Sequence, residues 1–236
     1  MSALPAAPTR YPRPDVMRGS AILLMIFFHG WYDLSVFGFV AMSMADPVWY
    51  SLRAVIVSLF CLTAGASLVW AHGKRTRWSA YAKRQGQLAA GALIVTAFSL
   101  IAYPTHWIYF GILHFFVLAL LISLPLLRLP RLSLVLGLLL IAAERFGVPY
   151  TDPWMYNVLQ PMLNLPSGTM DRMYLLPWLG VVWVGVWLGH QPWLRQGMPE
   201  FPGRRTIVWL GQRPLMIYLV HQPVLYGLAW LLYIAA

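Results

Sequence analysis

Two polar side chains interrupt an otherwise apolar stretch near the start of the chain. The stretch runs from Arg18 to Val40, and His29 and Asp33 lie near its middle. Residues four positions apart share one face of a helix, so the Asp33 carboxylate could orient the His29 imidazole and stabilise its protonated form. An imidazole oriented by a carboxylate is typical of a general base. The pair therefore predicts a chemical function for this segment.

Three further polar side chains are expected at membrane depth. A lone Asp33 carboxylate in hydrocarbon is costly, and Arg53 is expected at a similar depth, so we predict an ion pair between them. Counted at about 1.5 Å per residue, His29 lies about 14 Å from the cytoplasmic boundary, between His221 at about 10 Å and His114 at about 20 Å. The three histidines could line one path across the bilayer. The simpler interpretation is that His114 and His221 each hydrogen-bond a neighbouring helix.

The composition indicates which elements must position these groups. The chain has 236 residues, of which 60% are hydrophobic and 10% charged, and its mean hydropathy is +0.65. These values predict an all-α, polytopic transmembrane helical bundle formed by one domain, residues 1–236. A span needs about 20 apolar residues. Seven segments meet this requirement, at residues 20–40, 48–71, 85–103, 107–127, 131–147, 173–190 and 214–234.

The basic residues predict the orientation. With the N-terminal segment 1–15 in the cytoplasm, 14 of the 17 Lys and Arg residues lie on the cytoplasmic side, as the positive-inside rule requires. The C-terminus is then external. Residues 148–172 form the longest external connection, and the pattern of residues 203–213 predicts an interfacial helix on the inner face. We expect an integral protein of a bacterial inner membrane.

Charge and cysteine content narrow the function classes. The net charge of +10 is explained by topology and anionic lipid headgroups, so no nucleic acid is expected, and a phosphate-rich ligand on the cytoplasmic side is the sharper alternative. The single cysteine, Cys61, permits no internal disulfide. No metal-binding motif is present, and no metal or haem is expected. The small-residue stretch LTAGASL, Leu62 to Leu68, predicts close helix packing rather than a nucleotide loop.

Four motifs carry a resemblance to a known family. The segment RPDVMRGSAILLMIFFHGWYDL, Arg13 to Leu34, resembles the opening of the catalytic domain of heparan-α-glucosaminide N-acetyltransferase and its bacterial relatives. LFCLTAGASL (59–68) with YAKR (81–84), IYFGILHFF (108–116) and LGQRPLMIYLVHQPVL (210–225) agree in order. The resemblance implies a transmembrane acyltransferase that moves acetyl from cytoplasmic acetyl-CoA to a hydroxyl or amine, typically on a sugar. By this resemblance, His29 matches the catalytic histidine of the family. The resemblance also suggests a homodimer, and many members of the family have more than seven spans.

Site residues follow from this resemblance and from charge. His29 would act as general base or as a covalent acyl carrier, with Asp33 orienting it and Arg53, His114 and His221 supporting it. Asn157, Asn164 and Asp171, with Asp152, would face the acceptor in the external connection. The phosphates of acyl-CoA would meet a basic cytoplasmic mouth, although topology alone explains the same charges. Its residues are Arg13, Arg18, Lys83, Arg84, Arg204, Arg205 and Arg213.

Other functions remain open on the sequence. The principal alternative is a proton-coupled transporter of small solutes, in which His29, Asp33 and Arg53 form a relay. A haem-binding electron carrier and a non-enzymatic scaffold come next. For haem, the expected depths of His29 and His114 differ by about 6 Å, which does not favour a shared iron.

Overall fold

The computed structural model describes residues 11–146 and 152–236, and this part of the chain is helical and contains no strand. Four helices are long and apolar enough to cross a membrane. They are α1 (Pro12–Val36), α2 (Pro47–His72), α3 (Trp78–Ala102) and α9 (Pro214–Ala235). The predicted all-α class is confirmed for the described residues.

The remaining helices are shorter. They are α4 (Ile112–Ser123), which continues into the 3₁₀ helix η1 (Leu124–Arg128), α5 (Pro130–Arg145), α6 (Asp152–Leu163), α7 (Trp178–Gly189), the 3₁₀ helix η2 (Pro192–Arg195) and α8 (Arg204–Gly211). The spans predicted at 107–127 and 173–190 begin late because the backbone before Gly111 and Pro177 is not helical. The count of seven spans and the sides of the termini stay predictions.

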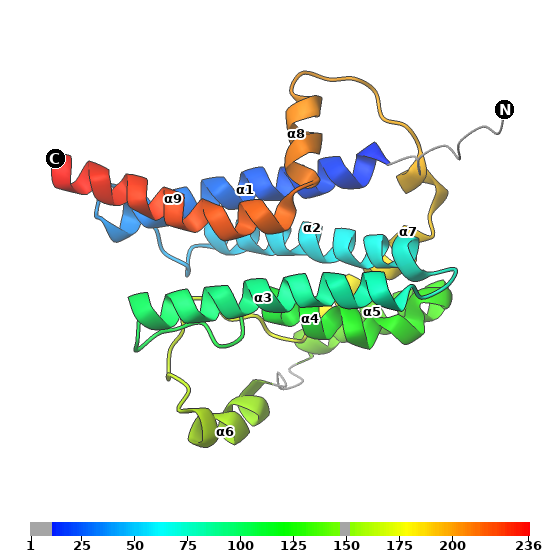
Figure 1. The fold of residues 1–236 in the computed structure, drawn as a ribbon, viewed down its shortest axis with the longest axis horizontal. Helices are drawn as coiled ribbons and strands as arrows, with labels where there is room; N and C mark the ends of the chain where they lie inside the picture. The colour runs from blue at the N-terminus through cyan, green and yellow to red at the C-terminus, as the bar shows by residue number, and fades with distance from the viewer. Residues whose placement is uncertain (1–10, 147–151) are drawn as a thin grey trace.

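The long helices α9, α1, α2 and α3 run in similar directions, and α8 stands across the direction of α1 (Figure 1). α1 packs against α2, α8 and α9, whereas α7 packs between α2 and α5, and α4 packs on α3. Fully buried apolar side chains from α2, α4 and α7 form the centre of the core, among them Cys61, Phe115 and Val182. The half of α2 that ends at His72 is therefore held by its neighbours.

The small residues of LTAGASL allow α2 and α7 to approach closely. A Cβ atom on Gly65 would lie 2.2 Å from the carbonyl oxygen of Val182, and one on Gly185 would lie 2.4 Å from that of Leu62. Only glycine fits at such a backbone contact. The sequence prediction of close helix packing at this stretch is confirmed.

The helix predicted at 203–213 is present as α8, and it docks on the first turns of α1. A Cβ atom on Gly19 would lie 1.9 Å from the carbonyl oxygen of Ile207, and one on Gly211 would lie 1.9 Å from that of Asp15. Pro214 then starts α9, as the fixed φ of proline favours at a first helical position. This contact joins the start of α1 to the segment that leads into α9.

The first span and the external connection differ from their predicted bounds. α1 begins at Pro12 rather than at residue 20, because Pro12 and Asp15 suit a first helical turn. Residues 152–163 of the connection form α6, which stands apart from the long helices (Figure 1). Residues 1–10 of the N-terminal segment, with Arg10, and residues 148–151 lie outside the described residues.

Candidate functional site between the histidine pair and a basic cavity

His29 of α1 and His221 of α9 are in direct contact. Their ring centroids are 4.9 Å apart with planes at 73°, and Nε2 of His221 lies 3.4 Å from Nδ1 of His29. His221 is buried and His29 is half-buried. The two rings therefore stand at one level, although the sequence count gave them different depths.

One arrangement of protons satisfies all contacts of the pair. Nδ1 of His29 lies 3.0 Å from the carbonyl oxygen of Met25, and Nδ1 of His221 lies 2.7 Å from that of Tyr218. A carbonyl only accepts, so each Nδ1 carries its hydrogen and each Nε2 carries a lone pair. The Nδ1–H of His29 is then shared with Nε2 of His221. In this assignment Nε2 of His29 is the basic atom.

Asp33 has a different partner from either one predicted. Its Oδ1 accepts a 2.8 Å hydrogen bond from Nε2 of Gln222, and the carboxylate is only 1% exposed. Within the described residues it makes no hydrogen bond to His29, because Met25 and His221 occupy Nδ1 of that ring. The predicted role of Asp33 in orienting His29 is therefore not what this geometry shows. Gln222 was missed, although an amide beside His221 was the available signal.

The predicted ion pair between Asp33 and Arg53 is wrong in this structure. Arg53 lies 3.7 Å from Oδ1 of Asp171 and donates to the carbonyl oxygen of Arg172 at 3.2 Å. Depth counting placed Arg53 near Asp33, but the side chain leaves α2 toward the segment that follows α6.

His114 stands apart from the histidine pair. Its Nδ1 accepts from the backbone N–H of Gly111 at 3.2 Å, and its Nε2 lies 3.2 Å from Oγ1 of Thr96 on α3. These contacts close the first turn of α4 and tie it to α3. The predicted line of three histidines is reduced to two, and the simpler interpretation holds for His114.

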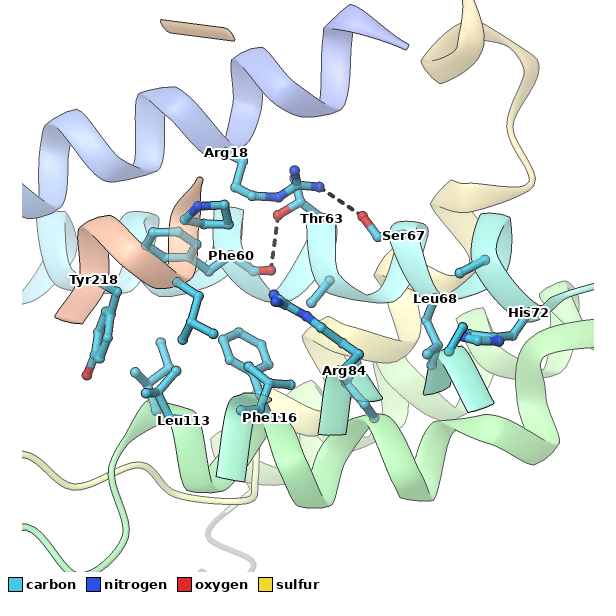
Figure 2. A pocket seen from close by; sticks show the side chains of 18 of the residues that line it. Arg18, Phe60, Thr63, Ser67, Leu68, His72, Arg84, Leu113, Phe116 and Tyr218 are labelled. Carbon is cyan, nitrogen blue, oxygen red and sulfur yellow. Dashed lines mark hydrogen bonds between the residues drawn. The ribbon is translucent and has the colours of Figure 1, made fainter. Parts of the chain in front are cut away.

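A cavity of about 420 Å³ lies between α2, α3, α4 and the start of α9 (Figure 2). Its apolar wall includes Phe60, Leu113 and Phe116, and Tyr218 is also part of the lining. Its polar groups come from both ends of the chain and from α2 and α3. They are Arg18, Thr63, Ser67, His72, Arg77, Arg84 and Gln212.

Arg18 links three of the elements around the cavity. Its guanidinium lies 3.0 Å from Oδ1 of Asp15, 2.8 Å from the carbonyl oxygen of Gly211 and 2.8 Å from Oγ of Ser67. Nε2 of Gln212 in turn lies 3.4 Å from Oδ2 of Asp15. The motif at 13–34 and the motif at 210–225 thus meet here, in addition to meeting at the histidines.

A second, larger hollow adjoins the cavity. It measures about 1590 Å³ and shares Arg18, Ser67, Ala71 and Arg77 with the first. Cations surround it, from α1, the α2–α3 turn and η2. They are Arg18, Lys74, Arg75, Arg77 and Arg195. The cavity therefore opens beside a basic surface, which suits a ligand that carries phosphates.

Only some of the predicted phosphate-binding residues line the cavity. Arg18 and Arg84 line the cavity, whereas the other five line neither hollow. Arg13 stacks on Trp193 and Arg213 on Trp209, Arg204 pairs with Glu200, and Lys83 and Arg205 are exposed. Arg77, His72 and Gln212 were not predicted as ligand-binding, because their direction depends on how α2, α3 and α8 pack.

The predicted acceptor-side residues are not gathered into one site. Asn157 on α6 and Asn164 just after it are exposed, and Asp171 lies against Arg53. Asn164 has a φ of +49°, which asparagine tolerates in a turn. The side chain of Asp152 lies outside the described residues.

Tyr218 connects the cavity to the histidine pair. Its side chain lines the cavity (Figure 2), and its ring centroid lies 5.6 Å from that of His221. Neither His29 nor His221 lines the cavity itself. Tyr218 therefore lies next to both the cavity and His221, the partner of His29.

These features define a helical integral membrane protein with a polar interior site next to a basic opening. The chain belongs to the family described as heparan-alpha-glucosaminide N-acetyltransferase, catalytic, whose model matches residues 10–223. No curated protein and no solved structure matches the chain. The family is one of membrane acetyltransferases, which agrees with the predicted resemblance.

Proposed function

We propose that this protein transfers the acetyl group of cytoplasmic acetyl-CoA to an amine or hydroxyl, on a sugar, with His29 as the catalytic residue. The observation that carries the proposal is the cavity, which runs from a basic opening to Tyr218 beside the His29–His221 pair. Transfer needs a phosphate-binding entrance, a channel for the donor and a base at its end. All three are supported by residues described above.

The donor fits the order of groups along the cavity. In the proposal the phosphates of CoA bind the cations of the outer hollow, together with Arg84. The pantetheine arm enters the inner cavity, whose volume of about 420 Å³ lies in the usual range of ligand sites. The thioester then reaches Tyr218, and this ring has to turn aside for the carbonyl carbon to approach His29.

The chemistry uses the lone pair on Nε2 of His29. The nitrogen or oxygen of the acceptor attacks the thioester carbonyl carbon, and its proton passes to Nε2. The bond from carbon to sulfur breaks, and the CoA thiolate takes the proton back from the imidazolium. In the covalent variant Nε2 itself attacks the thioester carbon and the CoA thiolate leaves; the acceptor then takes the acetyl group from Nε2, and its proton passes to the thiolate. His221 is a positioning residue in both routes, because it holds Nδ1 of His29.

The remaining parts of the proposal concern the membrane. Seven spans with the N-terminus inside place the basic hollow in the cytoplasm, where acetyl-CoA is available, in a bacterial inner membrane. The acceptor then arrives from the opposite face, near the segment that carries Asp171. A homodimer is part of the same proposal, as the family resemblance suggests.

The test is incubation of purified protein with acetyl-labelled acetyl-CoA, with and without a panel of amino sugars and neutral sugars. Wild type is expected to label a sugar, and His29→Ala is expected to lower the rate by a factor of about 10² to 10⁴. Label on the protein alone supports the covalent route. If the protein transfers no acetyl group but moves a solute into liposomes without an acyl donor, the proposed enzyme is wrong and the transporter hypothesis is supported.

A further inference from the structure

Two buried oxygen atoms beside the histidine pair lack hydrogen-bond partners. They are Oδ2 of Asp33 and Oε1 of Gln222, and no described residue donates to either. The other polar atoms of these two side chains satisfy each other, through the 2.8 Å bond from Nε2 of Gln222 to Oδ1 of Asp33. Buried acceptors are nearly always hydrogen-bonded in folded proteins, so this pair requires an explanation.

The described residues do not balance the Asp33 carboxylate. Arg53, the nearest cation that the sequence suggested, is paired with Asp171 instead. A carboxylate that is 1% exposed and lacks a cation is costly inside a membrane protein. An ionisable group in such a position is a candidate for a functional site.

The position of the pair relates it to the reaction centre. Asp33 lies one helical turn beyond His29 on α1, and Gln222 directly follows His221 on α9. The four side chains thus form two neighbouring contacts across the same helix interface, His29 with His221 and Asp33 with Gln222. A group bound at the second contact lies one turn from the base at the first.

We propose that Asp33 and Gln222 bind the acceptor substrate by receiving two donor hydrogens through Oδ2 and Oε1. The inference rests on the proposed function and names the residues that select the acceptor. Two neighbouring hydroxyls of a sugar supply the two hydrogens, so the group that is acetylated keeps its own proton for Nε2 of His29. The shared chemistry is two adjacent hydrogen-bond donors.

The local helix gives the acceptor a way in. Pro223 follows Gln222, and without an N–H it leaves the carbonyl of Leu219 without its helical partner. A helix bends most easily at such a position. Beyond Pro223 the residues of α9 are mostly exposed, and to separate this part of the helix from α1 means to part Phe37 from Tyr226 and Tyr233.

The experiment compares Gln222→Met, Gln222→Glu and Asp33→Asn with wild type and with Gln196→Met as the matched control on an exposed residue. The acceptors are D-glucosamine and D-glucose, which differ only in the amine or hydroxyl at one carbon. We expect Gln222→Met to raise the acceptor KM about tenfold and to leave the acetyl-CoA KM within about twofold. Gln222→Glu loses the N–H that donates to Asp33 and sets two buried carboxyl groups against each other, so it should also raise the acceptor KM.

The outcomes separate the two proposals. An unchanged acceptor KM in both Gln222→Met and Asp33→Asn, or a lowered Tm with no change in KM, overturns the subsite. A wild type that transfers no acetyl to either sugar overturns the proposed function. In that case the subsite is tested by the change in Tm of the protein when either sugar is added. A Tm increase in wild type that Gln222→Met abolishes supports it, and equal Tm values in both proteins overturn it.

Discussion

Nε2 of His221 lies 3.4 Å from Nδ1 of His29, and the two residues are 192 positions apart in the chain. The contact holds α9 against α1 and fixes the imidazole of His29 from the side opposite its basic atom. The family motifs at the two ends of the chain are thus parts of one site.

Replacing His221 by phenylalanine removes this contact and keeps the ring volume. We expect His221→Phe to lower kcat about tenfold, equivalent to about 1.4 kcal/mol in the barrier, with little change in either KM. The fall should be smaller than for His29→Ala, because the base itself remains. A His221→Phe enzyme that is as inactive as His29→Ala, with an unchanged Tm, would instead make His221 the base.

Two adjacent residues on α3 allow a test of whether a cation binds the donor or only follows the positive-inside rule. Arg84 lines the cavity, and Lys83 lines neither hollow. We expect Arg84→Ala to raise the acetyl-CoA KM about tenfold or more, because a hydrogen bond to a charged group is worth about 1.5–3 kcal/mol. Lys83→Ala should stay within about twofold. Equal effects of the two substitutions would show that general basicity, and not the cavity, binds the donor.

The contact between α1 and α8 depends on a residue without a side chain. A Cβ atom at Gly19 meets the carbonyl oxygen of Ile207 at 1.9 Å, so Gly19→Ala should destabilise the protein by about 1–3 kcal/mol. Gly86 is the matched control, since its Cβ would meet nothing within 4 Å on α3. Gly86→Ala should stabilise by up to about 1 kcal/mol. Thermal unfolding in detergent measures both, and a neutral Gly19→Ala would contradict the docking of α8.

The partner of Arg53 can be tested by double-mutant cycles. Arg53 and Asp171 are 30% and 32% exposed in their side chains, so solvent screens the pair and the coupling should be only about 0.5–1 kcal/mol. The cycle of Arg53 with Asp33 should give a coupling near zero. A larger coupling in the second cycle would restore the ion pair expected from depth and would revive the relay of His29, Asp33 and Arg53.

The orientation can be measured with introduced cysteines. Cys61 is fully buried, so it should contribute little background labelling. An impermeant maleimide should label Lys83→Cys only from the cytoplasmic side and Asn157→Cys only from the outside, since both positions are exposed. Labelling of both from one side would contradict the alternation of seven spans.

The sequence determined the properties that depend on composition and order along the chain. Hydropathy predicted the helical membrane class, and the small residues of LTAGASL predicted the close contact of Gly65 with α7. The opening motif predicted the family, which the match over residues 10–223 confirms. Each of these features is local, so no knowledge of the neighbouring helices was needed.

The tertiary structure decided which side chains meet. Counting residues along a helix gives a depth, but the direction of each side chain follows from the rotation of the helix against its neighbours. That rotation pairs Asp33 with Gln222 rather than with Arg53, and His29 with His221 rather than with Asp33. It also turns Arg84 into the cavity while Lys83 beside it faces away. Packing sets these contacts because the backbones meet where glycine allows them to, as at Gly19, and the side chains follow.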